Sequence, residues 1–191
     1  LGGKNLDEAI VDKIILPYLK ENYKIDSFLK DDTKKGQLNS VLNLYAEELK
    51  VSMSFSDEGE IVSMLGDLPD DDDGKEIELD ILVNAEDMND VLAPIFQIAI
   101  DHTLELLKRN KLKGSDLYSL LLVGGPTFSP ILRKMVSDQI CKPNTNVDPM
   151  TVVARGAAIY ATKFDVDEVI KDETRDTKKI QLDLTYDSDV V

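Results

Sequence analysis

Residues 120–136 read LLLVGGPTFSPILRKMV, and this stretch decides the fold of the chain. Its opening run of apolar residues is typical of a buried strand, which we place at residues 117–123. Gly124 and Gly125 end the strand, and because they lack a Cβ atom they allow a tight turn or the close approach of a ligand. Further on, Ser129 and Pro130 fit the N-cap and the first position of a helix, so a helix should cover residues 130–141. The stretch predicts a strand, a glycine turn and a helix.

Such a glycine turn has two interpretations. Paired glycines between a strand and a helix are often only a compact corner. A glycine turn ahead of a helix N-terminus can also expose backbone N–H groups to a flat or anionic ligand, as nucleotide sites do. The turn alone does not decide between them.

The composition excludes several kinds of protein. The chain has 191 residues, 42% of them hydrophobic, which is enough to bury a core. Its net charge of −15 argues against nucleic acid and anionic membranes as partners, and no apolar run reaches the length of about 18 residues that spans a membrane. One cysteine and one histidine cannot build a zinc cluster, so we expect no metal site in the chain. A lone cysteine fits a reducing compartment, here the cytoplasm, and the missing initiator methionine suggests a piece of a longer protein.

Periodicity of the apolar residues predicts the other elements. Helices should flank one hairpin before the glycine turn, and one more helix should follow it. The predicted elements are helices at residues 5–23, about 33–55 and 85–112, hairpin strands at residues 59–66 and 75–83, and a helix that opens at Pro149 with Asp148 as its N-cap. The hairpin tip reads PDDDDGK at residues 69–75. Pro69 and Asp80 stand where a calcium loop needs Asp and Glu, so we expect an acidic tip in solvent.

The helix at residues 33–55 has two faces. Its apolar residues recur at helical spacing and form one buried stripe, which consists of Leu38, Val41, Leu42, Tyr45, Leu49 and Met53. Glu47, Lys50 and Ser54 form a polar row on the opposite side. That row is either an ordinary solvated surface with a weak ion pair or one wall of a site.

Taken in order, three motifs resemble the second half of the nucleotide-binding domain of DnaK-type heat-shock chaperones of the seventy-kilodalton class, within the actin-like ATPase superfamily. LGGKNLDEAIV resembles the family's glycine pair before a helix, LLLVGGPTFSPILRKMV its adenosine-side motif VGGST-R-IP, and DPMTVVARGAAIYA its NPDEAVAYGAA. The likeness covers about residues 1–163. LDLT at residues 182–185 resembles the end of the interdomain linker.

This resemblance implies the fold class and the division of the chain. The fold would be α/β, an actin-like ATPase (ribonuclease H-like) half-domain with a helical and β-hairpin subdomain. Residues 1–84 would form a lid-like subdomain, and residues 85–163 an α/β subdomain with the adenosine-side glycine motif. Residues 164–191 would form a charged linker and the first strand of the substrate-binding region.

The resemblance also implies an adenine-nucleotide site. In the family, adenosine lies between the glycine turn and a helix that bears Glu, Lys and Ser, so Glu47 and Lys50 would bind the ribose hydroxyls and Ser54 an adenine edge. Val51 and Phe128 stand where the family stacks adenine between arginines, and would supply an apolar floor and an aromatic face. Pro126 replaces the usual serine, and Met150 an aspartate. The implied nucleotide-binding residues are Gly2, Gly3, Glu47, Lys50, Val51, Ser54, Gly124, Gly125, Pro126 and Phe128.

The function implied for the full-length relative is that of an ATP-driven chaperone. ATP or ADP would be the cofactor, and the Mg²⁺ ligands, phosphate loops and catalytic lysine would lie outside this chain. We therefore expect no catalytic residue and no meaningful hydrolysis in the chain alone, since phosphoryl transfer needs both sides of the cleft. The implied partners are a nucleotide-exchange factor on residues 1–84, and a co-chaperone and substrate-binding domain in the full-length protein.

Two further hypotheses remain open. In the first, the chain is a non-catalytic acidic protein-interaction module on a divergent actin-like scaffold. In the second, it is another actin-superfamily member such as a sugar kinase. The LDLT tail disfavours the second. Separately, a strand at residues 117–123 without neighbours would leave an exposed edge and favour self-association of the chain.

Overall fold

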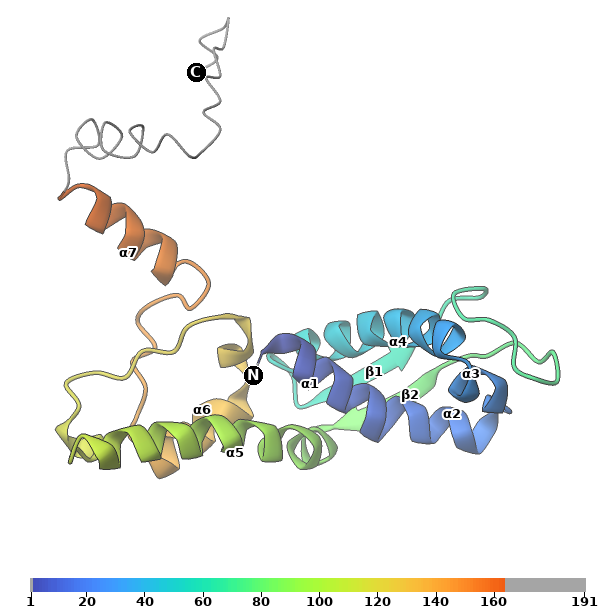
Figure 1. Cartoon of the computed structure of the whole chain (residues 1–191), viewed down its shortest axis with the longest axis horizontal. Coiled ribbons are helices and arrows are strands. Elements are labelled where there is room, and N and C mark those ends of the chain that lie inside the picture. The colour runs from blue at the N-terminus through green and yellow to red at the C-terminus, as the bar shows by residue number, and fades with distance from the viewer. Residues whose placement is uncertain (1, 164–191) are drawn as a thin grey trace, which may run out of the picture. The chain divides into compact units, whose positions relative to one another are not determined.

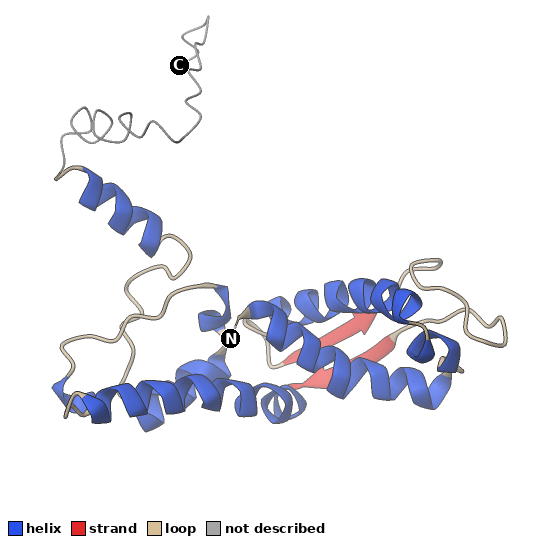
Figure 2. Cartoon of the chain, in the orientation of Figure 1, coloured by secondary structure: helices blue, strands red, loops and turns tan. Residues whose placement is uncertain are grey.

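The computed structural model describes residues 2–163 (Figure 1). The described residues divide into two units, one ending at residue 149 and one that begins at residue 150. The first unit is mostly helical and contains one two-stranded sheet (Figure 2). The linker and strand predicted at residues 164–191 lie outside the described residues.

The chain begins with three consecutive helical segments: α1 (Gly3–Ile10), the π-helical turn η1 (Val11–Ile15) and α2 (Leu16–Asn22). The helix predicted at residues 5–23 is confirmed. The wide π-helical turn η1 ends two residues before Pro17, which has no backbone N–H to donate to the preceding turn. The segment therefore stays helical across a proline at the cost of one widened turn.

A short helix α3 (Asp26–Lys30) precedes the long helix α4 (Asp32–Ser52). Asp31 begins α4 as a side-chain cap, because its carboxylate accepts the N–H groups of Thr33 at 2.9 Å and Lys34 at 3.1 Å. The predicted stripe is confirmed, with four members buried and the two others packed against the core: Leu38, Leu42, Leu49 and Met53, and Val41 and Tyr45.

The hairpin pairs β1 (Glu58–Val62) with β2 (Asp80–Asn84) in antiparallel register, Gly59 opposite Val83 and Ile61 opposite Ile81. Both strands are shorter than predicted. Past Val62 the chain leaves the ladder in a turn, in which Asp67 N–H bonds to the Met64 carbonyl and Gly66 has φ +82°. Apolar alternation continues through this turn, so alternation alone placed the strand end too late.

The acidic hairpin tip at residues 69–75 is exposed as predicted, except at Asp71, whose carboxylate docks on the protein. Asp71 is buried, and its carboxylate accepts the backbone N–H groups of Lys75 at 2.8 Å, Asp73 at 3.0 Å and Lys24 at 3.1 Å. Asp72 accepts the N–H of Ser27 at 2.9 Å. These bonds fasten the tip to the loop between α2 and α3.

Acid should release this docked tip. The pKa of Asp71 lies below its ordinary value because the N–H of Lys75, and then those of Lys24 and Asp73, stabilise the carboxylate. A lowered folded pKa contributes stability at pH values above the unfolded pKa of about 3.9, and this stability is lost as pH falls through that value and below it. Hydrogen exchange at the amides of Lys24 and Lys75 should accelerate, beyond the intrinsic pH effect, between pH 5 and pH 3. An Asp71→Asn variant should lose this pH dependence; a retained dependence would contradict the assignment.

The long helix α5 (Ala85–Arg109) follows the hairpin directly. Asn84 caps it, accepting from Glu86 N–H at 2.8 Å and Asp87 N–H at 3.0 Å. Pro94 lies inside the helix. The buried face of α5 adds Met88, Leu92 and Phe96 to the core.

Helix α6 (Pro130–Gln139) packs against α5 (Figure 1). Gln97 and Gln139 join the two helices through reciprocal side-chain amide bonds of 2.9 Å. In the sequence, the 3₁₀ turns η2 (Gly114–Asp116) and η3 (Gly125–Phe128) lie between α5 and α6.

The strand predicted at residues 117–123 does not form in the described part of the chain. One isolated bridge joins Leu121 to Asn144 in parallel orientation, with Asn144 N–H bonded to the Leu120 carbonyl at 2.8 Å. A ladder needs a neighbouring strand along its whole length, and among the described residues this segment has none. Leu121 and Val123 are about half exposed, so self-association through this segment stays a prediction.

In the second unit, α7 (Val152–Ala161) begins three residues later than predicted, and its N-cap is Thr151 rather than Asp148. The reason lies at Pro149, whose carbonyl accepts the N–H of Gly124 at 3.0 Å instead of a helical N–H. Among residues 2–163, no helix has the length and apolar character that crossing a membrane requires.

Candidate functional site

Lys50 on α4 forms a half-buried ion pair with Asp7 on α1. Its Nζ lies 2.5 Å from Asp7 Oδ1, and the two side chains are 14% and 9% exposed. A Cβ atom on Gly3 would lie 3.5 Å from the same Nζ, an ordinary van der Waals contact, so the ammonium lies beside the start of α1. The structure thus brings together Gly3 and Lys50, two of the predicted residues, and adds Asp7.

Glu47, one turn earlier on α4, is exposed and borders a cavity of about 440 Å³ between α1 and α4. Asp7 forms part of the same cavity wall, and so do Lys4, Glu8, Ser40, Asn43 and Leu44. The Oδ1 atom of Asn43 is buried and has no hydrogen-bond partner among the described residues. Of the polar row, Glu47 borders this hollow, which is lined by several hydrogen-bonding side chains.

Ser54 and Val51 complete the predicted residues at the end of α4. The Ser54 hydroxyl donates to the Lys50 carbonyl at 3.0 Å, so its proton is used within the chain and its oxygen remains an acceptor. Val51 is 53% exposed and offers an apolar surface in the last turn of the helix.

The glycine turn, formed by Gly124 and η3 (Gly125–Phe128), is held tightly. Gly124 has φ +95°, a conformation that side chains disfavour. Its carbonyl accepts the Thr127 N–H at 3.1 Å and the Thr127 hydroxyl at 2.6 Å, and Thr127 is buried. Pro126 is half-buried and Gly125 is exposed, so the turn presents a rigid, nearly bare surface.

Phe128 connects this turn to α4. Its ring centroid lies 6.0 Å from that of Phe55, with the planes tilted by 45°. The Arg133 guanidinium carbon lies 5.4 Å from the Phe128 ring centroid, and its Nε donates to the Thr127 carbonyl at 2.7 Å. Sequence reasoning missed Phe55 and Arg133.

The predicted residues thus fall into two groups that meet near the end of α4. Gly3, Lys50 and Glu47 gather around Asp7, whereas the glycine turn contacts Phe55 through Phe128. Lys50 lies in the last turn of α4, and Phe55 follows in the turn after the helix. Gly2 is the N-cap of α1 and donates its N–H to Asn5 Oδ1 at 3.0 Å.

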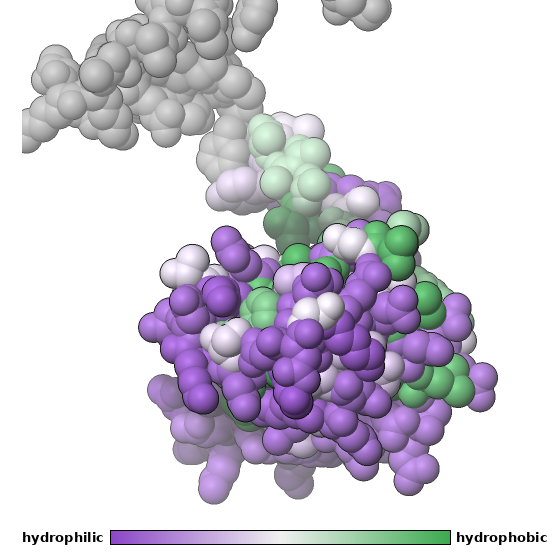
Figure 3. Space-filling view, turned by 90° about the vertical axis from the view of Figure 1, so that its right-hand side faces the viewer, coloured by the Kyte–Doolittle hydropathy of each residue, from purple (hydrophilic) through white to green (hydrophobic). Residues whose placement is uncertain are grey.

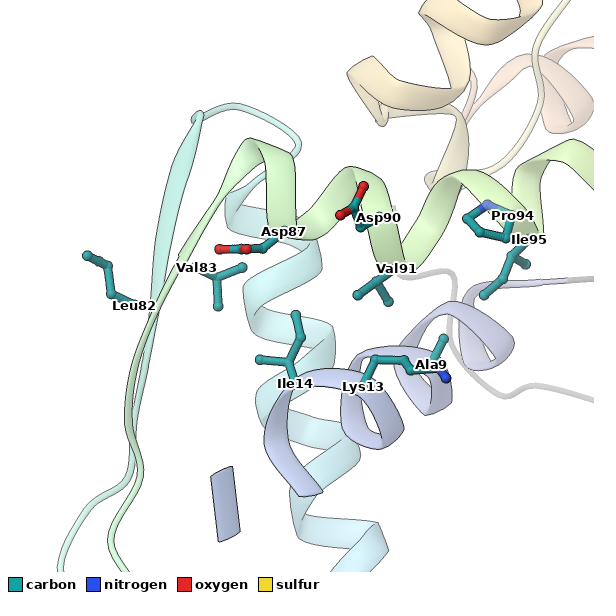
Figure 4. Close-up of a pocket in the computed structure, with 10 residues that line it drawn as sticks. All are labelled: Ala9, Lys13, Ile14, Leu82, Val83, Asp87, Asp90, Val91, Pro94 and Ile95. Atoms are coloured by element: carbon teal, nitrogen blue, oxygen red, sulfur yellow. The ribbon is translucent and has the colours of Figure 1, made fainter. Parts of the chain in front are cut away.

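A second cavity, of about 680 Å³, lies between the first helices, β2 and α5 (Figure 4). Ala9, Lys13 and Ile14 line it from one side, and Val91, Pro94 and Ile95 of α5 from the other. None of the predicted nucleotide residues borders it, and most of its lining is apolar. Within residues 2–163, no group of three His, Cys, Asp or Glu side chains could hold a metal ion.

The family model of the Hsp70 protein matches residues 1–189 of the chain. The chain belongs to the Hsp70 family. The resemblance to DnaK-type chaperones is thereby confirmed, and membership in the Hsp70 family implies an actin-like ATPase fold, in keeping with the mixed helices and small sheet described above.

Curated Hsp70 relatives named Chaperone protein DnaK are similar to this chain at modest identity. The protein of Thermoplasma volcanium is 34% identical over 194 residues, which cover 97% of this chain and 28% of the relative. That of Methanothermobacter thermautotrophicus is 31% identical over 163 residues, 83% of this chain and 25% of the relative. That of Nitrosopumilus maritimus is 28% identical over 162 residues, which cover 84% of this chain and 24% of the relative. The chain spans about a quarter of the length of these relatives.

Proposed function

We propose that this Hsp70-family chain forms the adenosine-binding side of a nucleotide cleft and, in the full-length protein, couples the ATP or ADP state to substrate binding. The contact between Phe55 and Phe128 supports this proposal most directly. It joins the turn after α4 to the side-chain-poor glycine turn, which supports a site between the end of α4 and that turn. A flat base and a hydroxyl-bearing sugar need such a combination of bare backbone and hydrogen-bonding groups.

Five of the predicted residues have direct roles in this proposal. The Glu47 carboxylate accepts from a ribose hydroxyl, and the Lys50 ammonium, which has protons beyond the one shared with Asp7, donates to another. The Ser54 oxygen accepts from an adenine edge. Gly124 and Gly125 leave space for the adenosine. Mg²⁺ and the catalytic groups would be supplied by residues outside this chain, so we expect no turnover from the chain alone.

The proposal includes the finer architecture. Residues 1–84 act as a lid-like subdomain that a nucleotide-exchange factor grips, and residues 85–163 act as the α/β subdomain of a ribonuclease H-like half-domain. Residues 164–191 lead to the substrate-binding region, and a co-chaperone acts on the full-length protein.

Titrating ADP into the full-length protein by calorimetry tests the site. Glu47→Ala and Gly125→Val should each weaken binding by about tenfold or more, since one removes a charged hydrogen-bond acceptor and the other fills the bare turn. Both residues are exposed, so the fold should be retained. The matched control is Glu48→Ala, an equally exposed carboxylate one residue along α4, which should bind ADP like the wild type. Unchanged affinity in both site variants would remove the assignment.

A non-catalytic acidic interaction module is a second candidate, and the hairpin surface favours it. Met64 and Leu65 are 77% and 80% exposed beside Val62 and Leu82, at the base of the acidic tip. The end of the first unit shown in Figure 3 is largely hydrophilic, with hydrophobic residues gathered along one edge. A wild-type protein that binds no adenine nucleotide would favour this function.

A further inference from the structure

Phe55 is an exposed aromatic residue in the turn after α4. Its side chain is 77% exposed, although a phenyl ring is among the largest apolar groups that folding can bury. Its N–H donates to the Ser52 carbonyl at 3.0 Å, so the backbone that carries the ring is fixed to the end of the helix. The ring is therefore presented to solvent at a fixed place.

Phe128 stands beside it under different constraints. Arg133 lies over the Phe128 ring at 5.4 Å and also bonds to the carbonyl of the neighbouring Thr127. This ring is half-buried and held by the turn, whereas the Phe55 ring is mostly uncovered. The ring centroids lie 6.0 Å apart with a 45° tilt, as in an aromatic pair in contact, so Phe128 supports the Phe55 ring on one side and leaves its other face uncovered.

Val51 extends the same apolar surface along α4. It lies four residues before Phe55 and is 53% exposed. Lys50 and Glu47 continue on the helix beyond it, so apolar side chains lie nearest the glycine turn and polar ones follow. A ligand that fits this order is flat and apolar at one end and carries hydroxyl groups at the other.

We infer that Phe55 is a base-stacking residue: the adenine ring lies against its exposed face, and the contact with Phe128 holds the Phe55 ring in place. This inference rests on the proposed nucleotide site and adds a residue that no motif pointed to. Aromatic stacking explains how a base can be held at a site that has Val51 and Phe128 in place of stacking arginines. Stacking on an aromatic side chain is worth about five- to a hundredfold in affinity for a base.

The experiment separates the aromatic ring from its size. ADP is titrated by calorimetry into the full-length protein with Phe55→Leu, which keeps an apolar side chain, and with Phe55→Tyr, which keeps the ring. We expect Phe55→Leu to weaken ADP binding by at least about fivefold and Phe55→Tyr to restore it to within about twofold of the wild type. Met64→Ala, an equally exposed apolar residue at 77%, is the control and should leave the affinity unchanged. Thermal unfolding should be the same in all variants, because position 55 contributes little buried area.

The outcomes separate this inference from the proposed nucleotide-binding function on which it rests. Wild-type affinity in Phe55→Leu, together with weakened binding in Glu47→Ala, would overturn the role of Phe55 and leave the nucleotide site intact. Equal losses in Phe55→Leu and Phe55→Tyr would also overturn it, since a surviving ring would then have no effect. A wild-type protein that binds no ADP would refute the proposed site and the stacking role together.

Discussion

Replacing Asp7 with alanine should destabilise the folded chain by about 3–5 kcal/mol, the usual result of leaving one buried charge without its partner. Lys50 and Asp7 are 14% and 9% exposed and lie 2.5 Å apart. Without the carboxylate, the ammonium would remain beside the N-terminus of α1, where the helix dipole disfavours a positive charge. Urea unfolding followed by circular dichroism would measure the loss.

The double variant with Asp7→Ala and Lys50→Met is the control for this prediction. It removes both charges, so most of the stability lost in Asp7→Ala should return. The same variant should still bind ADP more weakly than the wild type, because it lacks the proposed ribose donor. If the double variant were as unstable as the sum of both single variants, the two groups would not be coupled and the ion pair would carry no such role.

The faces of α4 could be predicted from the sequence, but not what each face meets. Helical spacing predicts that Lys50 lies away from the buried stripe, but in the structure its side chain is 14% exposed and pairs with Asp7. Its partner Asp7 lies 43 residues earlier, on another helix. Spacing within one helix carries no information on which helices pack together, so it predicts a solvated Lys50 or a site and cannot predict the pair with Asp7.

Phe55 escaped prediction for a related reason. It follows the last residue of α4, where helical periodicity no longer says which way a side chain points. Its contact with Phe128 joins segments that are far apart in the sequence. The motif that identifies the glycine turn contains Phe128 but has no signal for residue 55.

The acidic tip shows the limit of counting charges. Four consecutive aspartates suggest repulsion and solvent, yet Asp71 is buried, and its carboxylate accepts two N–H groups of its own turn and a third from Lys24. At residues 117–123 the error is the opposite one, because a segment predicted to be buried is partly exposed. Its apolar run predicts a buried strand, but a strand also needs a neighbour, which a local pattern cannot supply.

Substituting Gly114 with alanine should cost about 3 kcal/mol, the upper end for forcing an extra methyl group into a packed position. A Cβ atom there would lie 1.9 Å from the Ile140 carbonyl oxygen and 2.7 Å from its carbon. Both are backbone atoms at the end of α6, where the Ile140 N–H is itself bonded to the Val136 carbonyl at 2.9 Å. No side chain can rotate away, so the chain after α5 must move, and with it the segment that leads to Gly124.

Gly36→Ala provides a matched control of opposite sign. Gly36 lies inside α4, and a Cβ atom added to it would have no neighbouring atom within 4 Å, so alanine should stabilise the helix by about 0.5–1 kcal/mol. Urea unfolding of the two variants compares the same glycine-to-alanine change at a position with close neighbouring backbone atoms and at a position without them. Equal stability of Gly114→Ala and the wild type would show that α5 and α6 are not held together as closely as described, and the position of the glycine turn would then lack this support.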